Sequence, residues 1–125
     1  MNTTIHRTVS SYPKLPYDRM KDAILGKKYA LSLVFIGSVR AKTLNRKTRK
    51  KTYVPNVLSF PLTESAGEIF ITPEVAVREA KKRGMTEKGY VGFLFIHALL
   101  HLKGHHHGAT MERAEKKYLA IYGLS

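Results

Sequence analysis

Five of the six histidines in this chain fall within Phe93–Gly108, in the otherwise apolar stretch FLFIHALLHLKGHHHG. Three of them, His97, His101 and His107, follow the pattern H-x-x-x-H-x-x-G-x-x-H. Residues four apart lie on one face of a helix, so the first two imidazoles can converge on one ion. Glycine permits a left-handed turn, so a helix that ends at Gly104 can return the chain toward this pair. Three imidazoles with a fourth position left for water are typical of a catalytic zinc site.

Two interpretations of these histidines compete on spacing alone. A buried histidine pair can be held by ordinary hydrogen bonds, without a metal. If the histidines bind a metal, spacing alone does not decide the third ligand, since His105 and His106 adjoin His107 and could take its place. The pattern favours the metal, because H-x-x-x-H occurs often by chance and the longer pattern with its glycine occurs rarely.

Length and composition predict a single domain over residues 1–125. The chain is 43% hydrophobic, which is enough for one core. It has no cysteine, which excludes disulfide-linked partners, iron–sulfur clusters and thiolate zinc sites. Residues 1–11 are polar and no apolar run approaches the length of a membrane span, so we expect a cytoplasmic protein without a membrane partner.

The net charge of +13 predicts attraction to polyanions, with nucleic acid first. No acidic residue occurs from Ala23 to Thr63. A basic surface kept only for solubility usually mixes signs, so this acid-free segment favours a nucleic-acid contact over a merely solvated face. The part of the segment that we expect to contact the nucleic acid comprises Arg46, Lys47, Lys50 and Lys51.

Hydrophobic periodicity and turn residues predict an α+β fold, in which helices pack on a single mixed sheet of about four strands. Residues 38–47 read as a basic helix with Val39 and Leu44 facing inward, and Arg49 falls in the loop after it. The helix capped by Thr86 is apolar all round, so it is the central buried helix and carries the histidines. The expected strands are 3–10, 29–36, 56–60 and 67–72, and the expected helices are 17–25, 38–47, 74–83, 87–103 and 111–122.

The residue after the first histidine limits the chemistry. Zinc peptidases with H-E-x-x-H place a glutamate there as general base, and this chain has Ala98. Phosphodiester cleavage fits better, because a metal polarises a phosphate and acidifies a bound water while the basic segment recruits the polyanion.

Three stretches resemble one known family. The histidine stretch HALLHLKGHHH resembles the H-G-x-L-H-L-x-G-Y-D-H signature of the YbeY family of bacterial rRNA maturation factors, described as metal-dependent single-strand endoribonucleases. Leu44-Asn45, Arg49 and the stretch NVLSFP at 56–61 resemble the family's L-N-x-x-Y-R and T-D-V-L-S-F-P, and Gly67-Glu68-Ile69 resembles its G-D-I. The likeness runs in the same order from about residue 31 to 107.

The resemblance implies a function and a set of site residues. His97, His101 and His107 are expected to bind one zinc ion, or else nickel or another divalent metal, and Arg49 is expected near it as a catalytic residue. The implied activity is an endoribonuclease of rRNA maturation and ribosome quality control, with an rRNA precursor and the small ribosomal subunit as partners.

This sequence also departs from the family pattern. Ala98 replaces a glycine, His105-His106 replaces tyrosine-aspartate, and Pro55-Asn56 replaces threonine-aspartate. Two carboxylates expected near the site are therefore absent from these motifs, and carboxylates commonly orient ligating histidines. These departures favour an alternative, a ribosome-assembly or RNA-binding factor with a structural metal and little catalysis.

Overall fold

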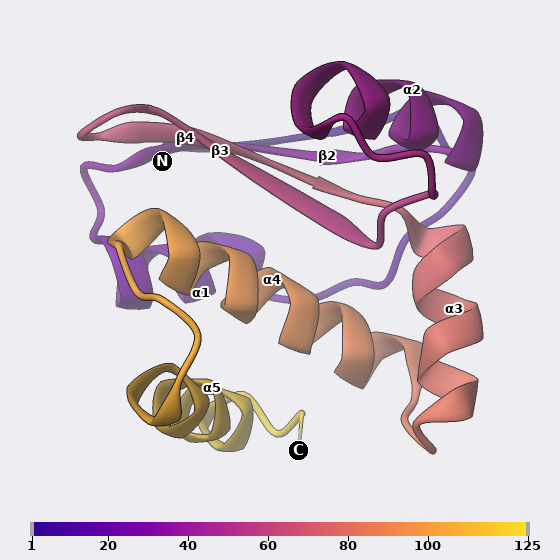
Figure 1. The fold of residues 1–125 in the computed structure, drawn as a ribbon. Coiled ribbons are helices and arrows are strands. Elements are labelled where there is room, and N and C mark those ends of the chain that lie inside the picture. Colours follow the sequence, from indigo (N-terminus) through magenta and orange to yellow (C-terminus); the bar gives the residue numbers. More distant parts are fainter. Residues whose placement is uncertain (1, 125) are drawn as a thin grey trace.

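A computed structural model describes residues 2–124, so Met1 and Ser125 of the predicted domain lie outside the described residues. The elements follow the predicted order of strands and helices, and the α+β prediction is confirmed (Figure 1). They are β1 Thr3–Arg7, α1 Tyr17–Leu25, β2 Ala30–Phe35, α2 Ser38–Arg49, β3 Val57–Thr63, β4 Ala66–Ile71, α3 Pro73–Lys82, α4 Glu87–Lys103 and α5 Ala109–Ile121.

The four strands form one mixed sheet in the order β1-β2-β4-β3. β1 and β4 flank β2 in parallel, and β3 pairs with β4 in antiparallel fashion at the edge. β2 therefore lies inside the sheet, as its apolar sequence predicts. Alternate residues of β2 and β4 are buried, so one face of the sheet points into the core.

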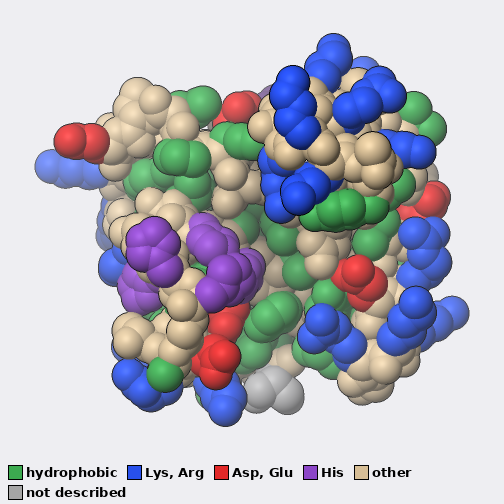
Figure 2. Space-filling model, viewed as in Figure 1, with side chains coloured by type: hydrophobic (Ala, Val, Ile, Leu, Met, Phe, Trp, Pro, Cys, Tyr) green, Lys and Arg blue, Asp and Glu red, His purple; other side chains and the backbone are tan. Residues whose placement is uncertain are grey.

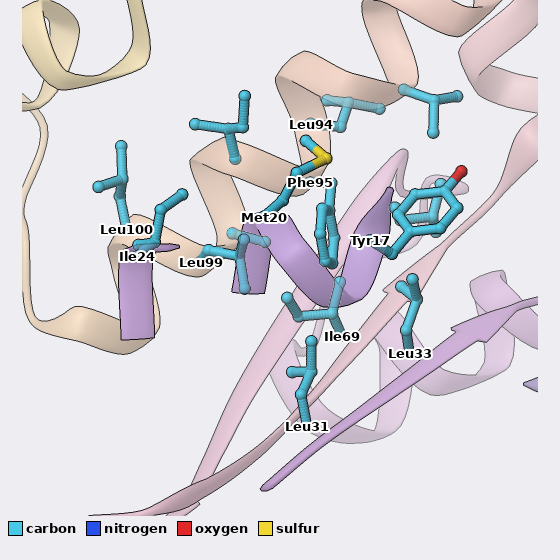
Figure 3. Close-up of a cluster of buried hydrophobic side chains, with 14 of the residues drawn as sticks. Tyr17, Met20, Ile24, Leu31, Leu33, Ile69, Leu94, Phe95, Leu99 and Leu100 are labelled. Atoms are coloured by element: carbon cyan, nitrogen blue, oxygen red, sulfur yellow. The ribbon is translucent and has the colours of Figure 1, made fainter. Parts of the chain in front are cut away.

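Helix α4 occupies the centre of the core, between the sheet and α5, and α2 lies on the opposite side of the sheet, over one end of it (Figure 1). Side chains of α1 and α4 meet those of β2 and β4 in one cluster (Figure 3). Tyr17 and Phe95, both buried, pack edge to face with ring centroids 5.1 Å apart. Burying each large apolar side chain stabilises the fold by roughly 1.5–3 kcal/mol, which fixes α4 firmly under the sheet.

The ends of α4 are set by local signals, as predicted. The Thr86 hydroxyl accepts a hydrogen bond from the backbone N–H of Gly89 at 3.0 Å, which caps the first turn. Gly104 ends the helix with a φ of 105°, a left-handed conformation that suits glycine. No helix within residues 2–124 is long and apolar enough to span a membrane.

The predictions for α2 were wrong in two places. Val39 is 83% exposed, whereas the buried side chains are Ala41 and Asn45, which lie four apart on one face. Val39 is two residues from Ala41, so it points away from that face. The helix also runs through Arg49, which therefore belongs to its last turn and not to the following loop.

Further boundaries differ from the prediction, and β1 ends at Arg7, three residues before the expected end at residue 10. Pro61 was expected to close β3, but the strand continues to Thr63. β3 is an edge strand, where a residue without an N–H leaves no partner unpaired. Helix α5 begins at Ala109, two residues before the predicted start at Met111, and Gly108 is its N-cap.

Candidate metal centre

The structure brings together the three histidines that the spacing singled out. His97 and His101 project from successive turns of α4, and their Nε2 atoms lie 3.2 Å apart. One nitrogen from each of His97, His101 and His107 lies within 4.8 Å of the others. Figure 2 shows the histidines gathered at one side of a hollow in the surface. Helical spacing places His97 beside His101, and the turn after α4 brings His107 to them.

The turn after α4 decides which later histidine joins the pair. Gly104 adopts the left-handed conformation, and the backbone N–H of His105 donates to the carbonyl of Leu100 at 3.0 Å. This reverses the chain and carries His107 back to the helix. Among residues 2–124, the cluster includes His107 and neither His105 nor His106.

A carboxylate that sequence reasoning missed supports the cluster. Oε2 of Glu115, on α5, lies 2.5 Å from Nδ1 of His97, and Glu115 is only 8% exposed. The signal lay in α5 itself: Met111, Glu115 and Leu119 are four apart, so the glutamate interrupts an apolar stripe. Although Asn56 and His106 stand where the family motifs have aspartate, α5 supplies a carboxylate from outside those motifs.

The surroundings of His97 and His101 suit imidazoles that act as ligands. With Glu115 as acceptor, Nδ1 of His97 carries the proton and donates it, which leaves Nε2 with a free lone pair. Burial lowers the pKa of His101 from its usual value, and the neighbouring His97 and His107 lower it further. A neutral His101 does not have to lose a proton before it binds a cation.

These residues fit a divalent metal with nitrogen ligands. Two nitrogens that bind one zinc tetrahedrally at 2.0–2.1 Å are about 3.3 Å apart, and the two Nε2 atoms are separated by 3.2 Å. All three histidines line an open cavity of about 660 Å³, so a fourth position faces space that a water or a substrate can enter. Three imidazoles suit zinc, nickel and cobalt, so the donor set does not select among them.

The same cavity, hereafter the cleft, also contains Arg49. This residue sits at the end of α2, is exposed, and lines the cleft with the three histidines. Its Nη1 donates to Oδ1 of the buried Asn45 at 3.4 Å, which holds the guanidinium over the cleft. Sequence reasoning missed two other cleft residues, Tyr53 and Arg83.

The four basic residues expected to contact RNA lie beside the cleft and not in it. Figure 2 shows Lys and Arg side chains gathered over α2, across the hollow from the histidines. Among the described residues, the cleft is lined by Arg49 and Arg83 as its basic groups. The four predicted residues are exposed and do not line the cleft: Arg46, Lys47, Lys50 and Lys51.

A hydrogen-bonded group closes the far side of the cleft. Nδ2 of Asn56 donates to Glu79 at 2.9 Å, and the hydroxyl of Tyr90 donates to the same carboxylate oxygen at 2.7 Å. Burial raises the pKa of Tyr90, and the bond to Glu79 raises it further, so the phenol stays protonated. The amide of Asn56 suits this arrangement, because it donates to Glu79 where an aspartate would repel it.

Comparison with known proteins gives a family match over most of the chain. The sequence profile described as Endoribonuclease YbeY matches residues 6–122. A protein of Bdellovibrio bacteriovorus named Endoribonuclease YbeY is 35% identical over 75% of this chain and 61% of its own length. One of the same name from Polynucleobacter asymbioticus is 38% identical over 73% of this chain and 63% of its own length. The chain thus spans about three fifths of the length of these relatives.

A solved structure supports the fold. The solution structure of TM1509 from Thermotoga maritima superposes with a TM-score of 0.67, over 94% of this chain and 86% of that protein, at 22% sequence identity. At that identity the likeness concerns the fold alone. Because the family profile matches residues 6–122, which is nearly the whole chain, this chain belongs to the YbeY family.

Proposed function

We propose that this chain, as a single domain over residues 1–125, is a metal-dependent endoribonuclease that cleaves single-stranded RNA in the cytoplasm. Its tasks would be rRNA maturation and ribosome quality control, with an rRNA precursor and the small ribosomal subunit as partners. The observation that carries the proposal is the cleft, in which three converging histidines and Arg49 line the same space. Membership of a family described as endoribonucleases supports RNA as the substrate.

The three histidines would hold the ion, and zinc is the metal that we favour. When bound there, a divalent metal supplies an acidified water and a positive charge beside the scissile phosphate. Glu115 orients His97 for this task by accepting the proton of Nδ1, and the pKa of His101 is lowered by burial and by its neighbours. These two features support the use of His97 and His101 as ligands.

Arg49 is the residue that we assign to the reacting phosphate. A guanidinium binds two phosphate oxygens through paired hydrogen bonds, which fixes both distance and orientation. The contact with Asn45 limits the rotation of the Arg49 side chain before RNA arrives. Arg46, Lys47, Lys50 and Lys51 would hold phosphates further along the strand, which brings the substrate to the cleft without reading its sequence.

The decisive experiment compares the wild type with His101→Ala, and with His6→Ala as the matched control. His6 is an exposed histidine of β1 outside the cluster, so its loss changes composition equally and leaves the site intact. Each protein is purified in parallel, its bound metal is measured by mass spectrometry, and cleavage of end-labelled single-stranded RNA is followed with and without a chelator. We expect wild type and His6→Ala to hold metal and to cut RNA, and His101→Ala to lose at least about 100-fold in rate.

Equal cleavage by wild type and His101→Ala would overturn the nuclease assignment, since activity would then come from elsewhere. If the wild type binds metal and RNA but cuts neither single-stranded nor double-stranded RNA, the chain acts as an RNA-binding factor with a structural metal. The absence of aspartates at positions 56 and 106 is the feature that favours that second outcome.

A further inference from the structure

Tyr53 stands at the rim of the cleft with much of its ring in solvent. Its side chain is 53% exposed, whereas the other aromatic side chains within residues 2–124 are buried or half-buried. It lies in the segment between α2 and β3 and lines the same cleft as the histidines and Arg49. Single exposed apolar side chains are common on protein surfaces, so it is the place of this ring in the cleft, and not its exposure alone, that points to a role.

The backbone of Tyr53 and the guanidinium of Arg49 both contact one buried side chain, that of Asn45. Nδ2 of Asn45 donates to the backbone carbonyl of Tyr53 at 3.1 Å, and Oδ1 of the same amide accepts from Nη1 of Arg49 at 3.4 Å. The backbone carbonyl of Asn45 also accepts from the N–H of Lys51 at 3.4 Å. Asn45 is fully buried in α2, so it ties the aromatic residue and the guanidinium to one rigid helix.

The surroundings of the ring indicate what could cover it. Arg49, Lys50 and Lys51 precede Tyr53 in the chain, and Arg83 lines the same cleft. This charge favours a polyanion and opposes a basic partner. Proteins that bind single-stranded nucleic acid combine such a groove with aromatic rings on which bases stack. In a duplex the bases are already stacked and paired, so a ring at the rim selects an unpaired strand.

We propose that Tyr53 stacks on an unpaired base of the RNA, next to the phosphate held by Arg49. The inference rests on the proposed function for the identity of the polyanion. It goes beyond that function because it assigns a base contact, and with it the choice of single strands, to one side chain. Asn45 links the two residues from below the surface, since it is fully buried and hydrogen-bonds the backbone of Tyr53 and the side chain of Arg49.

Binding measurements test the ring directly. A fluorescently labelled single-stranded RNA of about ten nucleotides is titrated with the proteins in the His101→Ala background, so that the RNA is not cut. We expect Tyr53→Ala to weaken binding by roughly 5- to 150-fold, the value of one base stacked on an aromatic side chain. Tyr53→Phe and Tyr53→Trp keep a stacking surface and should bind as the parent does. The matched control is Val39→Ala, since Val39 is an exposed apolar residue of the basic helix outside the cleft.

RNAs with one abasic site, moved along the strand, separate base stacking from a general effect on the surface. With Tyr53 present, one position should show a clear loss of affinity, and with Tyr53→Ala the same abasic site should cost nothing more. The inference is overturned if Tyr53→Ala binds RNA as tightly as its parent. It is also overturned if the loss of affinity caused by Tyr53→Ala and the loss caused by the abasic site simply add.

The two proposals fail in different ways. Failure of the proposed function appears as cleavage that does not depend on His101, whatever Tyr53 does to binding. Failure of the present inference appears as metal-dependent cleavage by wild type and Tyr53→Ala with the same KM. If Tyr53 contributes as inferred, its removal raises KM for single-stranded RNA much more than it lowers kcat, because the ring lies beside the reacting phosphate and not on it.

Discussion

Glu115 of α5 lies with its Oε2 atom 2.5 Å from Nδ1 of His97 on α4, and both side chains are largely buried. The two residues are separated by the turn that carries His107. This one contact joins the last helix to the histidine cluster, so α5 supports the candidate metal site as well as the core.

We expect Glu115→Ala to weaken zinc binding by about 10- to 100-fold, because His97 then loses the acceptor that fixes its tautomer and ring orientation. Zinc affinity is measured by competition with a chromophoric chelator, and folding without zinc by circular dichroism. Glu112→Ala is the control, because Glu112 is an exposed acid on the same helix. A folded Glu115→Ala protein that binds zinc like the wild type contradicts the assignment.

The third ligand can be tested against its neighbours. His107→Ala should lower zinc affinity strongly, whereas His106→Ala should leave it near the wild-type value, because only His107 of this pair joins the cluster. Both substitutions remove one imidazole from the same turn, so each is the control for the other. Calorimetric titration with zinc gives the affinities, and equal losses in the two variants would mean that the turn rearranges when the metal binds.

The basic residues beside the cleft should control the salt dependence of RNA binding. If Arg46, Lys47, Lys50 and Lys51 each contact a phosphate, changing all four to glutamine lowers the slope of log K against log salt by about 2.8, or roughly 0.7 per contact. The control changes four exposed lysines of α3 and α5, Lys81, Lys82, Lys116 and Lys117, which removes the same charge elsewhere. Identical slopes in the two quadruple variants would exclude α2 as the RNA surface.

The close packing around position 67 explains why the stretch Gly67-Glu68-Ile69 begins with glycine, and this can be tested. A Cβ at Gly67 would lie 2.5 Å from the hydroxyl of Tyr29 and 3.1 Å from Leu102. We expect Gly67→Ala to lower the free energy of unfolding by about 1–3 kcal/mol, as overpacking commonly does. Urea unfolding followed by circular dichroism gives the value.

Tyr29→Phe supplies the second arm of this test. The Tyr29 hydroxyl is buried without a hydrogen-bond partner among residues 2–124, so its removal alone should cost little. In the double variant the added methyl group meets less crowding, and we expect part of the lost stability to return. Strictly additive effects would show that the hydroxyl is not what excludes a side chain at position 67.

Local sequence signals fixed most of the elements and half of the site. Apolar periodicity placed the strands and helices in the right order, and Thr86 and Gly104 marked the ends of α4, because caps and turns depend on neighbouring residues. The pairing of His97 with His101 also followed from the sequence, since four residues make about one helical turn. These inferences needed no knowledge of what packs against what.

The tertiary structure alone decided the rest. Glu115 reaches His97 only because α5 folds back on α4, and no pattern within α5 states which helix its buried carboxylate will meet. Val39 was misplaced because a basic helix with few apolar residues leaves its inward face undefined until it packs on the sheet. Asn45 joins Tyr53 to Arg49 through contacts that depend on the path of the loop after α2. Spacing along one helix is local geometry, whereas contacts between elements depend on how the whole chain packs, and this is why the sequence located the ligands but not the residues that position them.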